Sequence, residues 1–149
     1  MINYKTQEPV SKKEFEEYYF FRWKILRKPI GMALDSVKDD LEDESFHLII
    51  KNKNRKIIAV GRMHFINRKN KDSAQIRYMA VDDKYKRIGL GSKILKSFEN
   101  KAMDHKMKKM ILHARENALD FYIKNGYKIK HKSHLLSNKI QHWLMYKNL

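Results

Sequence analysis

The sequence contains no cysteine. Disulfide bonds, thiolate metal sites and cysteine nucleophiles are therefore excluded, and a reducing cytoplasm is the compartment that we expect by default. No apolar run approaches the roughly 18 residues that a membrane-spanning helix needs. The first residues, MINYKTQEPV, also lack the apolar segment of a signal peptide. We therefore expect a cytoplasmic protein with no transmembrane helix and no membrane partner.

Acidic residues are scarce relative to basic ones. The 149 residues include 33 Lys or Arg and 17 Asp or Glu, which gives a formal charge of +16. Nucleic acid, an anionic membrane or an anionic cofactor would each explain this charge. The lysines are spread along the chain, which favours solvent-exposed lysines over a nucleic-acid partner. The length and a hydrophobic content of 42% predict one domain, residues 1–149, with a single core.

The acids that are present gather in one segment. Residues 35–44 hold six of the 17 acidic residues of the chain. In so basic a protein this segment has two interpretations, which the sequence leaves open. It is either a short solvated helix or an acidic rim that attracts a cationic acceptor molecule.

Local patterns predict the first elements of the chain. Ile2–Thr6 is expected to form a short strand. Ser11 is a good helix N-cap, and Glu14 three residues later completes a capping box. A helix is therefore predicted from this point to about Arg27. Its apolar stripe, expected to pack in the core, comprises Phe15, Tyr18, Tyr19, Trp23 and Leu26.

The next segments read as strands. Residues 46–51 and 56–66 predict a hairpin, with a turn at residues 52–55. Gly61 inside the second strand indicates a bulge or a close approach of the backbone to a neighbour. A polar loop is expected at residues 67–73.

The stretch from Ala74 to Ala102 reads as a strand, a turn with two glycines, and a helix. Gly89 and Gly91 stand at the expected helix start, where glycine lets backbone N–H groups turn toward one point. The positive end of the helix dipole adds to that field. Lys84, Lys86 and Arg87 bring further positive charge to the turn. This pattern predicts a cradle for a pyrophosphate group.

A second strand-and-helix segment follows. Residues 109–114 predict a strand, Asn117 is a candidate cap for a short helix, and Gly126 stands where a left-handed C-cap residue is wanted. The last two strands are expected at residues 127–134 and 140–146.

Strand parity gives two expectations for the basic strand near the end of the chain. Lys128, Lys130 and Lys132 alternate, so they would share one face, which we interpret as plain solvent surface. The same parity would send His131 and His134 to opposite faces. We therefore predict no metal site.

Two of these segments resemble the signatures of the GNAT acyltransferase superfamily. The first signature has a strand, then Gln/Arg-x-x-Gly-x-Gly/Ala, then a helix; here it reads Lys86-x-x-Gly89-x-Gly91, and lysine keeps the positive charge. The second, Asn-x-x-(x)-Phe-Tyr-x-x-x-Gly-Phe/Tyr, is matched by residues 117–127. The resemblance implies an α/β (mixed α+β) fold. Its centre is a mixed, mostly antiparallel sheet of about six or seven strands flanked by about four helices.

The resemblance also implies a set of site residues, with acetyl-CoA as co-substrate and no metal. The end of the central strand would pair with the pantetheine arm, the cradle would hold the pyrophosphate, and Asn117 would contact the arm. Tyr122 would contact the cofactor and protonate the departing thiolate. The residues implied to bind the cofactor are Met79, Ala80, Val81, Lys86, Arg87, Ile88, Gly89, Leu90, Gly91, Ser92, Asn117 and Tyr122.

The general base is less clearly marked. Many members of the superfamily carry a glutamate on the central strand, where this sequence has Gln75 and Arg77. His64, His113 and Glu116 remain as candidates, acting directly or through water. His113, just before the second signature, is our choice as the catalytic base.

Three functions stay open at this point. The first is an acetyl-CoA-dependent N-acetyltransferase acting on a primary amine of a small molecule or peptide, by direct attack in a ternary complex. The second is a basic nucleic-acid-binding protein, and the third is a non-catalytic CoA-binding protein on the same scaffold. The resemblance favours the first, with a cationic amine as one candidate acceptor. Dimers are common in the superfamily, so a homodimer is a further expectation.

Overall fold

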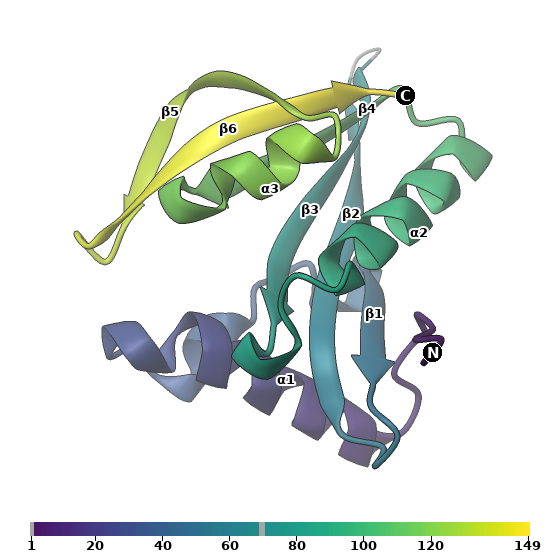
Figure 1. Cartoon of the computed structure of the whole chain (residues 1–149). Helices are drawn as coiled ribbons and strands as arrows, with labels where there is room; N and C mark the ends of the chain where they lie inside the picture. Colours follow the sequence, from purple (N-terminus) through teal and green to yellow (C-terminus); the bar gives the residue numbers. More distant parts are fainter. Residues whose placement is uncertain (1, 69–70) are drawn as a thin grey trace. The chain divides into compact units, whose positions relative to one another are not determined.

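The computed structural model describes residues 2–68 and 71–149, which contain three α-helices, five short 3-10 helices and six strands (Figure 1). The α-helices are α1 (Lys12–Leu26), α2 (Leu90–Asp104) and α3 (Leu119–Lys124). The strands are β1 (Phe46–Lys51), β2 (Ile57–Arg68), β3 (Lys71–Val81), β4 (Lys109–Arg115), β5 (Lys128–Leu136) and β6 (Ile140–Asn148). The 3-10 helices are η1 (Lys28–Ile30), η2 (Leu34–Val37), η3 (Glu42–Glu44), η4 (Asp83–Tyr85) and η5 (Glu116–Ala118).

The six strands form one mixed sheet in the order β1-β2-β3-β4-β6-β5. The β1–β2, β4–β6 and β5–β6 pairs are antiparallel, and β3 pairs with β4 in parallel. The predicted fold class, a mixed and mostly antiparallel sheet with flanking helices, is confirmed. No helix within residues 2–68 and 71–149 is both long and apolar enough to cross a membrane.

The chain divides into two compact units. The first consists of residues 1–64 and 78–98, and the second of residues 65–77 and 99–149. Strands β2 and β3 and helix α2 each contribute to both units. Each unit is described by itself below, and the single domain expected from the sequence stays a prediction.

In the first unit, helices pack against both faces of the sheet. Tyr18, Phe21 and Leu26 of α1 form a buried cluster with Ile49, Val60, Tyr78 and Ala80 of the strands. Gly61 follows Val60 on β2 and therefore points to the opposite face of the sheet, toward α2. A Cβ atom at Gly61 would lie 2.8 Å from Ile94 Cγ2 and 2.8 Å from Met79 Sδ. Gly61 therefore marks the close approach that the sequence indicated, whereas the register of β1 and β2 shifts between Ile50 and Lys51.

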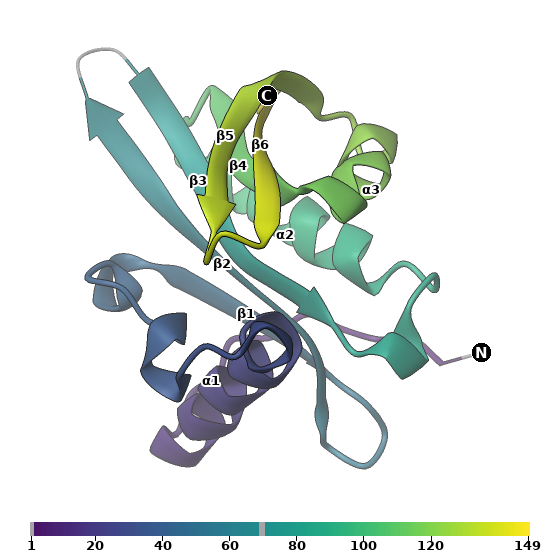
Figure 2. The ribbon, with the colours of Figure 1, turned by 90° about the vertical axis from the view of Figure 1, so that its left-hand side faces the viewer.

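In the second unit, α3 runs along one side of β6 (Figures 1 and 2). Met110, Leu112 and Ala114 of β4 and Met145 of β6 are buried. The C-terminus of α3 is a Schellman motif: Tyr127 N donates to Tyr122 O, and Gly126 N donates to Ile123 O. Gly126 has a φ of 91°, which confirms the predicted left-handed C-cap.

Three predicted local features differ in the structure. Ile2–Thr6 forms no strand, and only Gln7 makes an isolated bridge, to Ile49. The polar loop expected at residues 67–73 is replaced at both ends by longer strands, β2 to Arg68 and β3 from Lys71, and its middle lies outside the described residues. Asn117 lies within η5 and does not cap α3, whose N-cap is Ala118.

Register shifts on β5 overturn both parity predictions. Lys128 pairs with Tyr146, whereas Lys132 pairs with Trp143, so these two lysines lie on opposite faces. The cause is an extra residue between Ile129 and His131, which makes a β-bulge. A second shift between Lys132 and Leu135 brings His134 onto the face of His131, described below.

Candidate active site

In the first unit, the end of β3 has an unusual backbone. Tyr78 has a φ of 58°, in the left-handed region that a bulky residue in a strand rarely adopts. The residues implied to pair with the pantetheine arm, Met79 to Val81, follow directly. The parallel ladder to β4 runs from Ser73 to Ile76, so these residues lie beyond its last rung. Nothing in the sequence marked Tyr78 as a site residue.

Arginine side chains surround the ring of Tyr78. The guanidinium carbons of Arg22, Arg62 and Arg27 lie 4.0, 5.1 and 5.6 Å from the ring centroid. Arg22 and Arg62 are completely buried. Cation–π contacts of this kind strengthen when the cation is desolvated. The ring of Tyr78 is therefore fixed from several sides, which helps to hold its strained backbone.

Two residues of the acidic segment neutralise these arginines. Glu42 accepts hydrogen bonds from Arg22 Nη1, at 3.0 Å, and from Arg62 Nη1. Asp39 accepts from Arg62 Nη1 at 2.6 Å. Burial opposes the charge of Arg62, but these two acids raise its pKa above the ordinary value. Neither predicted role of the segment, a solvated helix or an acidic rim, applies to Asp39 and Glu42, because both carboxylates pair with buried arginines. The pattern of residues in the sequence does not reveal such an ion pair.

The turn between β3 and α2 is the predicted anion cradle. Gly89 has a φ of 87° and Arg87 a φ of 65°, so two residues of the turn have a left-handed backbone. Gly89 O accepts from Lys93 N, which leaves the N–H groups of Leu90, Gly91 and Ser92 without an acceptor inside the helix. An added Cβ at Gly89 would meet open space. Lys86 makes an exposed ion pair of 2.8 Å with Asp83, which lowers the pKa of that carboxyl.

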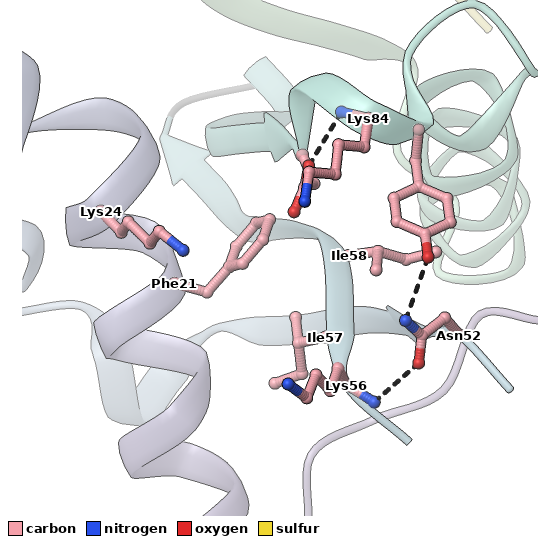
Figure 3. Close-up of a pocket in the computed structure, with 9 residues that line it drawn as sticks. Phe21, Lys24, Asn52, Lys56, Ile57, Ile58 and Lys84 are labelled. Atoms are coloured by element: carbon pink, nitrogen blue, oxygen red, sulfur yellow. Dashed lines mark hydrogen bonds between the residues drawn. The ribbon is translucent and has the colours of Figure 1, made fainter. Parts of the chain in front are cut away.

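A cavity of about 280 Å³ opens beside this turn (Figure 3). Three lysines and two aromatic rings take part in its lining, and Asn52 Nδ2 donates to Tyr85 Oη at 3.1 Å. The lining residues are Phe21, Lys24, Asn52, Lys56, Ile57, Ile58, Asp82, Lys84 and Tyr85. Of these, only Lys84 belongs to the predicted cradle.

In the second unit, Tyr122 is buried on α3. Burial raises the pKa of its hydroxyl above the usual value of about 10, while the nearby charge of Arg115 opposes the rise. The hydroxyl therefore keeps its proton at neutral pH. Arg115, the last residue of β4, was not recognised in the sequence, although it stands just before the second signature. Asn117 is exposed on η5.

His113 lies on β4, with its Nδ1 atom 3.0 Å from Ser133 Oγ. His113 is exposed to solvent, but partial burial of its ring lowers its pKa, and the basic groups of His134, Arg77 and His131 lower it further. The ring is therefore neutral at neutral pH and able to accept a proton.

The other two candidate bases have structural partners. His64 is buried, and its Nδ1 atom lies 3.3 Å from Arg62 Nη2, as expected for two residues on one strand face. Glu116 accepts a hydrogen bond from Trp143 Nε1 at 3.3 Å. Among residues 2–68 and 71–149, no group of His, Asp and Glu side chains is arranged to hold a metal ion.

Comparison with known proteins identifies the family. The family model described as an acetyltransferase (GNAT) domain matches residues 26–149. An uncharacterized N-acetyltransferase of Bacillus subtilis, YjcF, is 25% identical over 139 residues, which cover 93% of this chain and 95% of that protein.

Solved structures agree in fold. An acetyltransferase of the GNAT family from Staphylococcus aureus Mu50 superposes with a TM-score of 0.78 at 16% identity, over 99% of both chains. A GNAT family acetyltransferase from Elizabethkingia anophelis, solved with acetyl-CoA bound, superposes with a TM-score of 0.74 at 16% identity, again over 99% of both chains. Because the family match spans most of the sequence, the chain belongs to the GNAT family of acetyltransferases.

Proposed function

We propose that the protein transfers the acetyl group of acetyl-CoA to a primary amine of a small molecule or peptide, by direct attack in a ternary complex. The observation that carries this proposal is the turn before α2. A left-handed Gly89, free helix N-terminal N–H groups and open space at the glycine together suit a pyrophosphate. Family membership supports acetyl-CoA as the ligand.

The first unit would hold the acetyl-CoA. Backbone N–H groups from Arg87 to Ser92 would bind the pyrophosphate, and Lys86 would exchange its exposed Asp83 partner for phosphate. Met79 to Val81 would pair with the pantetheine arm in the manner of a strand. A backbone N–H near Ala80 or Val81 would donate to the oxyanion of the tetrahedral intermediate, a role that is worth about 3 kcal/mol.

The second unit would supply the proton transfers. The amine nitrogen attacks the thioester carbon, and His113, directly or through water, takes the proton that the nitrogen loses. The C–S bond then breaks, and the Tyr122 hydroxyl gives its proton to the departing sulfur. A raised pKa keeps the tyrosine protonated before this step, and a lowered pKa keeps the histidine neutral. Asn117 would contact the cofactor arm.

Calorimetric titration with acetyl-CoA tests the cradle. Gly89→Glu places a side chain and a negative charge where the pyrophosphate would lie, so binding should fall at least about a hundredfold. Gly31→Glu is the matched control, since Gly31 also has a positive φ, 74°, and open space at its Cβ position. Wild-type protein that does not bind acetyl-CoA, or Gly89→Glu protein that binds it normally, would refute the proposal.

The chain suits a simple test of the chemistry. Because it has no cysteine, a thiol reagent added to the reaction reports only the CoA that is released. Tyr122→Phe should lower kcat by roughly 100- to 10,000-fold with little change in acetyl-CoA affinity, because it removes only the acid. Equal kcat values for wild-type and Tyr122→Phe proteins would exclude Tyr122 as the acid.

A further inference from the structure

One face of the sheet in the second unit carries a cluster of histidine and arginine side chains. Residues paired across a ladder point to the same face, and β4 pairs with β6 so that His113 lies opposite Leu144 and Arg115 opposite His142. Leu144 also pairs with His131 of β5. We call this set the His–Arg face; it consists of Arg77, His113, Arg115, His131, His134 and His142.

The histidine rings of this face are packed together. The ring of His134 stacks on that of His142, with centroids 4.2 Å apart and planes 18° apart. It also lies 5.3 Å from the ring of His113. Stacked imidazoles do not aim their nitrogen lone pairs at one point, so the arrangement does not suit a shared metal ion.

The titratable groups that make up the His–Arg face are all basic. Burial lowers the pKa of His142 to about 4, and His134, Arg115 and His113 lower it against the opposing effect of the Ile140 carbonyl. The groups that lower the pKa of His113 are likewise basic: His134, Arg77 and His131. Each of these groups therefore disfavours protonation of the next, whereas an anion bound among them would favour protonation of the histidines and would be attracted by the two arginines.

Two lysines lie beside this face. Lys128 of β5 pairs with Tyr146 on the same face, and Lys109 Nζ lies 5.5 Å from the Tyr146 ring. The carboxylate of Glu116 accepts a hydrogen bond from Trp143 Nε1. Trp143 pairs with the buried Ala114, so the Trp143 side chain lies on the opposite face of the sheet.

The His–Arg face is linked to the proposed chemistry by two of its members. His113 is the proposed base, and Arg115 and Tyr122 each act on the pKa of the other. We infer that the acceptor amine carries an anionic group, a carboxylate or a phosphate, that binds to the His–Arg face. This inference rests on the proposed function, and it reverses the cationic acceptor that the acidic segment suggested. The same positive field would help the reaction, because it favours the neutral, nucleophilic form of the amine.

Matched acceptor pairs test the inference. Alanine and lysine are compared with their α-carboxamides, and phosphoethanolamine with ethanolamine, by release of CoA. The first two pairs report on a carboxylate and the last on a phosphate. We expect kcat/KM to be at least about tenfold higher for the anionic member of one kind of pair. The amide has the less basic amine, so intrinsic reactivity favours the opposite result.

Charge-removing variants locate the effect. Arg77→Gln and Arg115→Gln should reduce the preference for the anionic acceptor about tenfold, through KM. The ratio of kcat/KM values within a pair is not affected by a change in the chemical step that is common to both acceptors. Lys124→Gln removes an exposed charge of α3 and should leave the ratio unchanged. Equal rates within all pairs, or a preference that survives both arginine variants, would overturn the inference.

A binding measurement separates this inference from the proposed function. Succinate and inorganic phosphate are titrated into full-length protein, and the ring resonances of His113 and His142 are followed by NMR. We expect binding of at least one probe, weakened by Arg77→Gln, with a rise in the pKa of both histidines. If acetyl-CoA binds but neither probe shifts these resonances, only the inference fails. If the probes bind but acetyl-CoA does not, the proposed function fails.

Discussion

Replacing Glu42 by Gln tests whether the buried arginine cluster depends on one shared carboxylate. Glu42 is the common acceptor of Arg22 and Arg62, both of which are fully buried. Glutamine keeps the shape of the side chain, but it removes the charge and presents an NH₂ group to one guanidinium. Removing one partner of a buried ion pair typically costs about 3–5 kcal/mol. Arg62 keeps Asp39 and Arg22 keeps the Val37 carbonyl, so we expect the lower value, about 3 kcal/mol.

Urea unfolding, read by tryptophan fluorescence, measures this loss. For a chain of this size, about 3 kcal/mol corresponds to a fall in Tm of roughly 6–12 °C. Asp40→Asn is the matched control, because it makes the same change of charge at an exposed site of the same segment. We expect the control to change the unfolding free energy by less than about 0.5 kcal/mol. If Glu42→Gln and Asp40→Asn were equally stable, the buried arginines would not depend on Glu42 and our reasoning would be wrong.

Three further predictions concern stability. Gly61→Ala should cost about 1–3 kcal/mol in urea unfolding and weaken acetyl-CoA binding, because the new methyl group displaces Ile94 and Met79. Tyr127→Phe should cost about 2 kcal/mol, since the Tyr127 hydroxyl donates to the buried carboxylate of Glu99 at 3.0 Å; an unchanged urea midpoint would contradict this. The free energy of unfolding should fall as pH drops from 6.5 to 4, because His142, with a pKa of about 4 in the folded chain, is protonated first in the unfolded chain. His142→Gln should flatten this slope in urea titrations at stepped pH.

The sequence predicted the elements whose signals are local. The capping box at Ser11 is present in a modified form: Glu14 N donates to Ser11 Oγ at 3.0 Å, while the Glu14 carboxylate accepts from Val10 N, one residue before the cap. Ile94, Leu95, Phe98 and Ala102 of α2 recur at a 3.6-residue period in the sequence, and all four are buried. The last hairpin turns at Ser137 and Asn138, both with positive φ, and Lys139 N donates to Leu136 O across this turn.

Features that depend on distant partners could not be predicted. Ile2–Thr6 has a suitable composition for a strand, but only the following residue, Gln7, bridges to β1. A bulge on β5 is a property of the pairing with β6, and the inserted residue reversed the face of Lys132. His131 and His134 both lie on the His–Arg face only because two such shifts occur. Charge counting along the sequence could not separate it from the solvent-exposed lysines.

The candidate site was predicted in its motifs but not in its support. The glycine turn carries its own signal, because a positive φ selects glycine at Gly89. Tyr78 carries no such signal: a left-handed tyrosine costs of the order of 1–3 kcal/mol and persists only where its surroundings fix it. Here those surroundings are Arg22 and Arg62, which in turn need the acids of the segment at residues 35–44. The acidic segment therefore acts on the strand end through the arginines, and its charge is used inside the first unit to shape the strand that is proposed to receive acetyl-CoA.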